Sequence, residues 1–203
     1  MTLWGTKLNT DQNLCPDCRI FKEICLCDHI RKFALKTRLT LLIHVKEIKR
    51  ITNTGRFALY SLENSKAVLK GGLESVYQTH ELVPDEYQSI LLTPHAPSVL
   101  NKFSLQSFSK PVNLIVPDGT WQQVRRLISS EKKLHAIPHF KLPSENNVFS
   151  TLRKAPQENF LPTLGAIAQA LGIIENHEIQ EYFENLIEIM IQRLKKRLYR
   201  KSD

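Results

Sequence analysis

The sequence predicts an α/β protein with a largely parallel sheet, preceded by a small N-terminal zinc-binding segment. Nearly continuous apolar runs alternate with stretches of helical periodicity, which is typical of parallel strands covered by helices on both faces. All four cysteines lie within residues 15–27, ahead of the first apolar run. Hydrophobic residues make up 42% of the 203 residues and charged residues 24%. This composition can bury a core and excludes a wholly disordered chain.

Strands are expected where short apolar runs end at a proline, a lysine or a glycine pair. Runs at 39–45, 88–94 and 111–117 are rich in Leu, Ile and Val, as in strands that are buried on both faces. A shorter candidate at 67–69 is stopped by two glycines. We therefore expect these segments to form the sheet.

Helical periodicity lies between and after these runs. Apolar residues recur at three- to four-residue spacing at 57–62, 121–128, 164–171 and, most clearly, 179–198. The last of these begins with acids and ends with bases, which suits the helix dipole. Part of the basic charge at the C-terminus therefore has a purely structural explanation. The chain is expected to divide into a short cysteine-containing segment, 1–36, and an α/β domain, 37–203.

The cysteine cluster has the spacing of a metal site. The four thiols stand as Cys15-x2-Cys18 and Cys25-x-Cys27, and four thiolates so spaced can surround one tetrahedral Zn²⁺. Because protein would fill all four positions, the metal is expected to be structural. An iron–sulfur cluster is the main alternative, while disulfides are disfavoured in a reducing cytosol. The segment is too short for a core of its own, so metal binding should supply much of its folding free energy.

The charge balance favours a polyanionic partner. Lys and Arg number 28 against 20 acids, a net charge of +8, and the pI is near 9.4. Residues 31–56 are rich in bases and contain a single acid, Glu47. Solvated basic faces are the alternative explanation, but two separate basic clusters make nucleic acid the leading partner.

Nothing in the sequence favours a membrane. The longest uncharged run, 159–174, is interrupted by Pro162 and Gly172 and is too short and polar to span a bilayer. Residues 1–14 contain no apolar stretch of secretory type. We therefore expect a soluble cytoplasmic protein with no membrane partner.

The chemistry is expected beyond the carboxyl ends of the strands, where open α/β sheets bind ligands. The strand at 111–117 runs into Asp118-Gly119-Thr120-Trp121. Gly119 allows backbone amides to approach a ligand closely, while Thr120 and Gln123 match a helix capping box. The tetrapeptide is therefore either a catalytic turn or a capped helix start with Trp121 in the core.

Three other segments, two after expected strands and one at the start of an expected helix, carry polar sequences. Thr52-Asn53-Thr54-Gly55 offers hydroxyls and an amide beside basic side chains that can bind phosphate or carboxylate, although Asn53 or Thr54 could simply cap a helix. The segments 92–97 and 160–168 are the other two. No G-x-G-x-x-G or Walker loop is present, so ordinary nucleotide-binding folds lose support.

Taken together and in this order, the motifs resemble the DTW-domain family. The motifs are Cys15-x2-Cys18-x6-Cys25-x-Cys27, Arg50-x-Thr52-Asn53-Thr54-Gly55-Arg56 and Asp118-x-Thr120-Trp121. The resemblance extends from the cysteines to about Gly172 and implies a tRNA-uridine aminocarboxypropyltransferase. Such an enzyme moves the 3-amino-3-carboxypropyl group of S-adenosylmethionine to N3 of a tRNA uridine (acp3U formation) and releases methylthioadenosine. The resemblance also implies a SPOUT-like fold with a C-terminal trefoil knot, which the periodicity alone does not indicate.

The sequence departs from the family around 160–168. The family usually has Ser-Thr and an acid opening that helix, whereas this chain has Pro162 and Gly165 in those places. Thr163 can still cap the helix, and proline is tolerated in a first turn. The missing acid makes a catalytic role for this turn doubtful.

These arguments assign the candidate residues. The catalytic candidates are Asp118, as general base or as a group that orients substrate, Thr120, and Trp121, which could stack on a base or on adenine. The expected donor-binding residues are Thr93, Pro94, Pro117, Gly119, Leu161, Pro162 and Thr163. The expected RNA-binding residues are Lys49, Arg50, Asn53, Arg56, Arg125 and Arg153, of which Arg56 and Arg153 could instead bind the donor's carboxylate.

Two other functions remain open at this point. One is a zinc-containing RNA-binding protein without catalysis, and the other is an RNA methyltransferase that uses the same donor. In each case tRNA or another RNA is the expected partner, and no protein partner is required.

Overall fold

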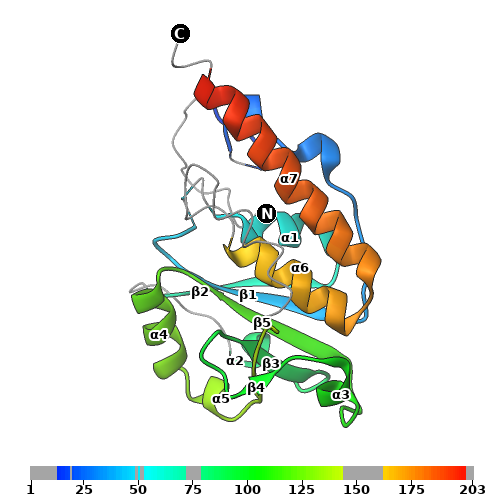
Figure 1. Ribbon diagram of the computed structural model, residues 1–203. Helices are drawn as coiled ribbons and strands as arrows, with labels where there is room; N and C mark the ends of the chain where they lie inside the picture. The colour runs from blue at the N-terminus through cyan, green and yellow to red at the C-terminus, as the bar shows by residue number, and fades with distance from the viewer. Residues whose placement is uncertain are drawn as a thin grey trace.

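Six parallel strands form the centre of the protein (Figure 1). In the computed structural model, the described residues are 13–18, 20–48, 50, 53–71, 79–143 and 162–199. The strands are β1 (Arg38–His44), β2 (Ser65–Lys70), β3 (Gln88–Leu92), β4 (Ser98–Val99), β5 (Val112–Asp118) and β6 (His139–Lys141). Their order is β2-β1-β5-β3-β6-β4, and every paired strand is parallel. The predicted parallel α/β sheet is confirmed.

The four strands expected from the sequence are all present. β4 and β6 were not predicted, because strands of two and three residues are too short to show a period. They extend the sheet beyond β3, where β6 pairs with both β3 and β4. The extension matters because residues that follow β6 line the cleft described below.

The expected helices are also present, together with short ones that the periodicity did not reveal. The helices of more than one turn are α1 (Gly55–Ser61), α4 (Trp121–Ser129), α6 (Pro162–Ile174) and α7 (His177–Tyr199). The short ones are α2 (Thr79–Leu82), α3 (Lys102–Leu105) and α5 (Lys132–His135), with 3-10 turns η1 (Lys22–Ile24) and η2 (Cys27–His29). No described helix combines the length and apolar character needed to span a bilayer.

Helices cover both faces of the sheet (Figure 1). On one face, alternate residues of β1 such as Leu41 pack in a core with α1, α6 and α7. On the other face, Leu42 packs with Leu127 of α4 and Leu134 of α5. Adjacent strands thus send their following helices to opposite sides, with α1 after β1 on the first face and α4 after β5 on the second. This arrangement opens a crevice at the carboxyl ends of β1 and β5.

The cysteine segment packs on α7. Ile20, Ile24 and Leu26 are buried in the same core as Phe183 and Leu186. The segment therefore shares its apolar core with the helices of the main body, in addition to any stabilisation from a metal.

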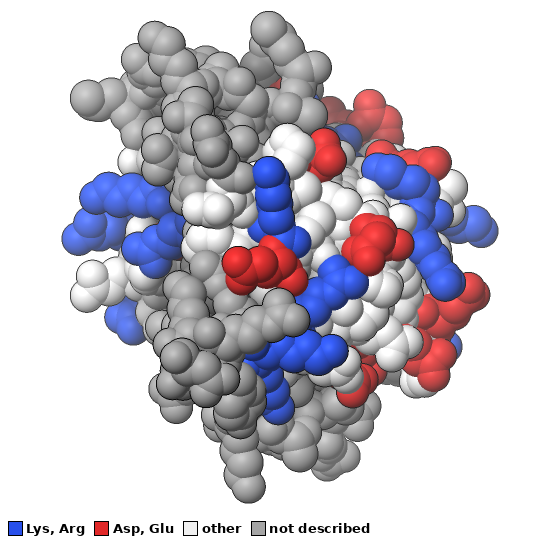
Figure 2. Space-filling model, turned by 90° about the horizontal axis from the view of Figure 1, so that it is seen from above, with Lys and Arg blue, Asp and Glu red and all other residues white. Residues whose placement is uncertain are grey.

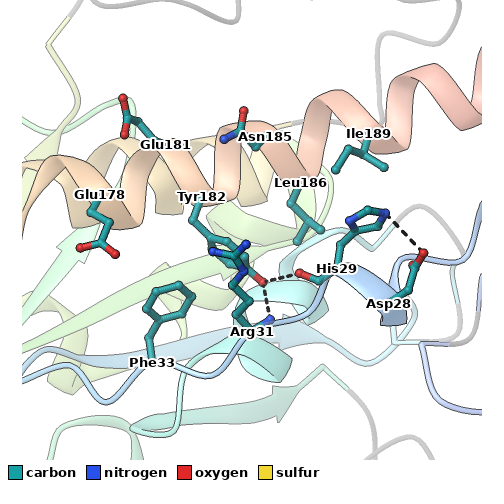
Figure 3. A pocket seen from close by; sticks show the side chains of 10 residues that line it. All are labelled: Asp28, His29, Arg31, Phe33, Glu178, Glu181, Tyr182, Asn185, Leu186 and Ile189. Atoms are coloured by element: carbon teal, nitrogen blue, oxygen red, sulfur yellow. Dashed lines mark hydrogen bonds and ion pairs between the residues drawn. The ribbon is translucent and has the colours of Figure 1, made fainter.

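Polar contacts reinforce this joint. The hydroxyl of Tyr182 accepts a hydrogen bond from the backbone N–H of Arg31 at 3.0 Å and donates one to the carbonyl of His29 at 3.3 Å. The guanidinium of Arg193 donates to both carboxylate oxygens of Asp28, at 3.2 and 2.9 Å. A hollow of about 320 Å³ lies over the joint (Figure 3). Its acids, which include Glu178, make it a poor site for an RNA phosphate.

The predicted trefoil knot depends on the path of the chain between β6 and α6. Residues 144–161 of that connection lie outside the described residues. The SPOUT-like knot therefore stays a prediction.

Candidate active site

A cleft of about 720 Å³ opens at the carboxyl ends of β3, β5 and β6. Its walls come from the loop after β1 and from the starts of α4 and α6. This is the crevice that the opposite placement of α1 and α4 creates. The cleft lies beyond the carboxyl ends of the strands, the place where the sequence analysis looked for a ligand site.

Most of the predicted catalytic and donor-binding residues line this single cleft. They are Asp118, Thr120, Trp121, Thr93, Pro94, Pro117, Gly119 and Thr163, and two predicted RNA-binding residues, Arg50 and Asn53, join them. Leu161, Lys49 and Arg153 lie outside the described residues. Pro162 is the first residue of α6, a helix position that suits proline because its missing N–H is not needed there.

Asp118 is the most unusual group in the cleft. It is the last residue of β5, and its side chain is buried with 8% exposure. Oδ1 accepts a 2.7 Å hydrogen bond from the hydroxyl of Thr163, whereas Oδ2 is buried without a hydrogen-bond partner among the described residues. Burial raises the pKa of Asp118, the nearby Glu47 carboxylate raises it further, and the Thr163 hydrogen bond opposes the shift. Such a carboxyl can take up a proton more readily than an exposed aspartate.

The turn after Asp118 is also a capped helix start, as the sequence predicted. Thr120 is the N-cap of α4, and Thr120 and Gln123 form the capping box. A Cβ on Gly119 would lie 3.1 Å from Gln123, so the glycine makes room for the capping side chain. The side chain of Thr120 therefore has a structural task in this turn.

Trp121 stands at the rim of the cleft. Its side chain is 63% exposed, and its ring centroid is 5.9 Å from that of His95. The interpretation of Trp121 as a core residue is wrong, because it occupies the solvent side of the first turn of α4. An exposed indole beside an open cleft can stack on a base.

The loop after β1 contributes a second buried carboxylate that the sequence analysis did not select. Glu47 is only 8% exposed, and its Oε2 pairs with Nε of Arg50 at 3.1 Å. Its other oxygen, Oε1, is buried without a partner in the described part of the chain, as is Oδ1 of Asn53. The available signal was that Glu47 is the lone acid in a basic stretch, but the sequence alone could not show that it is buried.

Arg56 has a different role from the predicted one. It is 1% exposed, and its guanidinium donates to the carbonyls of Asn53 at 2.7 Å, of Cys18 at 3.1 Å, and of Arg50. This burial contradicts the prediction that Arg56 contacts RNA or the donor's carboxylate. Arg56 instead fastens the cleft loop to the cysteine segment.

For three further predicted residues, the structure shows which groups remain available to contact a ligand or RNA. The backbone N–H of Thr93 already donates to Phe140, and its carbonyl accepts from Ala96, so its hydroxyl is the group left for a ligand. Asn53 is 4% exposed and faces the cleft, not an outer RNA surface. Arg125 is exposed on α4 and can contact a polyanion.

Several cleft residues come from elements that the sequence did not reveal. Lys141, Leu142 and Pro143 follow the short strand β6, Val99 ends β4, and Gln169 comes from α6. Lys141 and Arg50 bring positive charge to a cleft that also holds two carboxylates. No local pattern marked these positions, because β4 and β6 are visible only once the sheet is assembled.

The four cysteines meet in one place. Their Sγ atoms all lie within 4.8 Å of one another, with Cys15 and Cys27 3.7 Å apart and Cys18 and Cys25 3.6 Å apart. A Zn–S bond of about 2.3 Å requires S···S distances of roughly 3.8 Å in a regular tetrahedron. The thiols thus fit a four-coordinate zinc ion. Because burial raises the pKa of Cys18 to about 11, metal binding would release protons.

Charge on the face seen from above is mixed (Figure 2). On the described part of that face, blue Lys and Arg side chains are interspersed with red Asp and Glu side chains. The excess of basic residues therefore does not form a single stripe there. Basic side chains near the cleft, such as Arg50 and Lys141, are the ones placed to act together with it.

The fold and the site define an α/β protein with an open cleft at the carboxyl edge of a parallel sheet and a cluster of four thiols in its N-terminal segment that could hold a metal ion. The DTW domain model matches residues 12–195. The chain belongs to the DTW domain family.

Similar curated proteins carry one name, tRNA-uridine aminocarboxypropyltransferase 2. The Drosophila melanogaster protein is 28% identical over 171 residues, which cover 81% of this chain and 68% of that protein. The Mus musculus protein is 27% identical over 188 residues, covering 88% and 63%. The Macaca fascicularis protein is 28% identical over 174 residues, covering 82% and 58%. The matched region thus spans about three fifths to two thirds of the length of these relatives.

Proposed function

We propose that this protein transfers the 3-amino-3-carboxypropyl group of S-adenosylmethionine to N3 of a uridine in tRNA. The observation that carries the proposal is the buried Asp118 carboxyl, which lines an open cleft at the carboxyl edge of the sheet and has one oxygen without a hydrogen-bond partner among the described residues. Membership of the DTW domain family and the names of the similar proteins support the substrate class.

The reaction is a displacement at the methylene carbon next to the sulfonium. A bond forms between N3 of uridine and this carbon, while the carbon–sulfur bond breaks and its electron pair stays on sulfur. Methylthioadenosine leaves as a neutral thioether, and the proton of N3 passes to Asp118. Because the donor's own positive charge activates the carbon, the protein mainly has to position the two reactants.

Asp118 suits the role of general base. A base works best when its pKa approaches the working pH, and burial moves the pKa of Asp118 upward. Thr163 holds one carboxylate oxygen at 2.7 Å, so the other is fixed in direction. Trp121, exposed at the rim, would stack on the target base and bring N3 to this oxygen.

The tRNA would be held mainly through its phosphates. Arg50, Lys141 and Arg125 are the described cations on or near the cleft that suit this contact. Binding through phosphates releases counterions, so affinity should fall steeply as salt rises. The cysteine segment would support this surface through the hydrogen bond from Arg56 to Cys18.

Mass spectrometry of tRNA tests the proposal. The full chain is incubated with tRNA and with donor that is isotopically labelled in its aminocarboxypropyl group. We expect a labelled uridine and an equal amount of methylthioadenosine. Methylated RNA with adenosylhomocysteine would indicate a methyltransferase, and tRNA binding without either product would indicate a binding protein.

A matched pair of variants locates the chemistry. Asp118→Asn should abolish transfer and leave tRNA affinity nearly unchanged, because it removes the base and keeps the shape. Asp85→Asn alters an exposed aspartate before β3, at the opposite end of the sheet, and should leave both unchanged. Full transfer by Asp118→Asn would refute its role as the base.

A further inference from the structure

Three buried oxygen atoms of residues that line the cleft have no hydrogen-bond donor among the residues that the structure describes. They are Oε1 of Glu47, Oδ1 of Asn53 and Oδ2 of Asp118. Their residues are 8%, 4% and 8% exposed, so each is more than nine-tenths buried, and all three line the same cleft. Only one other side-chain atom in the described residues, Nε of Arg38, is buried without a partner. Buried acceptors are normally satisfied, so their concentration here points to a ligand that supplies donors.

The free oxygens are held in place by what their neighbouring atoms do. Each carboxylate has one oxygen engaged: Thr163 donates to Oδ1 of Asp118 at 2.7 Å, and Nε of Arg50 pairs with Oε2 of Glu47 at 3.1 Å. Nδ2 of Asn53 points toward the backbone carbonyl of Glu47 at 3.5 Å, which leaves Oδ1 facing the other way. The three side chains also lie close together, because the charge of Glu47 raises the pKa of Asp118 and the side-chain amide of Asn53 lowers it.

The chemistry of these atoms selects the ligand group. Two carboxylates and an amide oxygen favour a cation with several N–H donors, and an ammonium group has three. A sulfonium is cationic but has no N–H. The uracil edge offers one N–H between two carbonyl oxygens, which would face acceptors.

We propose that Glu47, Asn53 and Asp118 form the binding site for the α-ammonium group of the aminocarboxypropyl chain. This inference rests on the proposed function and specifies how the donor is oriented. The carbon that bears the ammonium is two bonds from the reacting methylene. Anchoring the ammonium beside Asp118 therefore brings the methylene near the carboxylate that takes the proton of uridine.

Such a site also determines which part of the donor is transferred. A pocket built to accept N–H donors rejects an analogue that lacks them, because its buried oxygens are then left unpaired. The ammonium site would therefore hold the aminocarboxypropyl chain inside the cleft. Arg50 pairs with Glu47 and would therefore lie near the donor's carboxylate, which is bonded to the same carbon as the ammonium.

Calorimetric titration of Glu47→Gln tests the proposal. Glutamine keeps the shape of the side chain but removes its negative charge. Two ligands are titrated into the wild-type chain and the variant: S-adenosylmethionine, which has the ammonium, and methylthioadenosine, which lacks the whole amino-acid chain. We expect Glu47→Gln to weaken binding of S-adenosylmethionine by tenfold or more and to leave methylthioadenosine binding within twofold. Glu86→Gln, at an exposed acid before β3, is the control and should change neither.

A third ligand separates a direct contact from an effect through Arg50. Decarboxylated S-adenosylmethionine retains the ammonium and lacks the carboxylate. If Glu47 binds the ammonium, the weakening persists with this ligand. If the weakening disappears, Glu47 acts only by holding Arg50 against the carboxylate, and the proposal is overturned.

The remaining outcomes are also decisive. Equal weakening of S-adenosylmethionine and methylthioadenosine, no weakening of either, or a weakening that appears only with added Mg²⁺ would overturn the ammonium site. A melting curve of Glu47→Gln that matches the wild type shows that the fold is intact, and Asn53→Leu should reproduce the ligand selectivity if Glu47→Gln fails to fold. If the wild-type chain binds neither ligand, the proposed function itself fails, and this failure is distinguishable from that of the site.

Discussion

The hydroxyl of Thr163 donates a 2.7 Å hydrogen bond to Oδ1 of Asp118, joining the first turn of α6 to the end of β5. The two residues lie on elements that are far apart in the sequence, and their contact fixes the direction of the carboxyl in the cleft. The methyl group of Thr163 lies close to Gly55, where an added Cβ would come within 3.1 Å of it. Thr163 therefore links three elements of the site.

Replacing Thr163 by valine should shift the pH profile of transfer. The Thr163 hydrogen bond lowers the pKa of Asp118 against the effect of burial, so its loss raises that pKa. The acidic limb of kcat against pH then moves to higher pH, and stability falls by about 1 kcal/mol. Thr163→Ser keeps the hydroxyl and should keep the wild-type profile. An unshifted Thr163→Val profile would contradict a role for this bond in tuning the base.

Asp118→Asn should stabilise the protein while it abolishes transfer. Burial raises the folded pKa of Asp118 above its ordinary value of 3.8, so the folded state holds the proton to higher pH than the unfolded chain does. Stability therefore falls as pH rises from the unfolded pKa through the folded pKa.

Thermal melting of Asp118→Asn across pH measures this effect. At neutral pH, where the wild type carries a buried charge, the variant should be more stable by about 1 kcal/mol, which raises Tm by roughly 2–4 °C. The difference should shrink as the pH falls toward the ordinary pKa. A variant less stable than the wild type at neutral pH would contradict the raised pKa.

Removal of the metal should disorder the cysteine segment first. Four thiols with the spacing of a tetrahedral site lie in this segment, and its residues Ile20, Ile24 and Leu26 share a core with α7. A strong chelator should increase amide hydrogen exchange in this segment and along the α7 surface that it covers, before the sheet exchanges. Elemental analysis of the fresh protein should find about one zinc per chain. A protein that holds neither zinc nor iron would refute the metal site.

Arg56 and Arg125 should respond to substitution in opposite ways. Arg56 donates to three backbone carbonyls in the interior, and lysine cannot replace that fork. We expect Arg56→Lys to cost about 3 kcal/mol or more in unfolding free energy. Arg125→Ala, on an exposed face of α4, should change stability by less than about 0.5 kcal/mol and reduce the salt slope of tRNA binding by about 1. Denaturant melts and salt titrations measure both, and an unaltered melt for Arg56→Lys would contradict its structural role.

Trp121→Ala should impair substrate binding with little effect on folding. The indole is 63% exposed, so its removal costs little packing, whereas a stacked base is worth about 1–3 kcal/mol. KM for tRNA should rise by roughly 5- to 150-fold, and Trp121→Phe should recover much of the loss. A large drop in Tm with unchanged KM would show that Trp121 is structural.

Much of the site could be predicted from local sequence. The four-cysteine spacing, the capping box at Thr120 and the position of Asp118 at a strand end are local patterns, since each depends on residues a few positions apart. The parallel sheet followed from strong apolar runs separated by helical periodicity. β4 and β6 were not predicted, because strands of two or three residues are too short to show a period.

Burial, however, depends on packing between distant segments. Glu47 and Arg56 both come from a basic stretch that suggested an exposed RNA-binding surface, yet both are buried. The sequence was equally consistent with a Trp121 that packs in the core and one that stacks on a base, and the structure shows its side chain exposed. In each case the outcome depends on which helix or loop covers the residue.

The amino-acid order by itself determined the longer strands and helices, the grouping of the four cysteines and the strand end that carries the acid, because short-range periodicity and spacing specify these. Only the tertiary structure decided that Glu47 and Asn53 join Asp118 in one cleft and that Arg56 is buried and donates to backbone carbonyls. The physical reason is that the dielectric surroundings and hydrogen-bond partners of a side chain are supplied by residues remote in the chain. Those partners exist only after the sheet has brought the strand ends together.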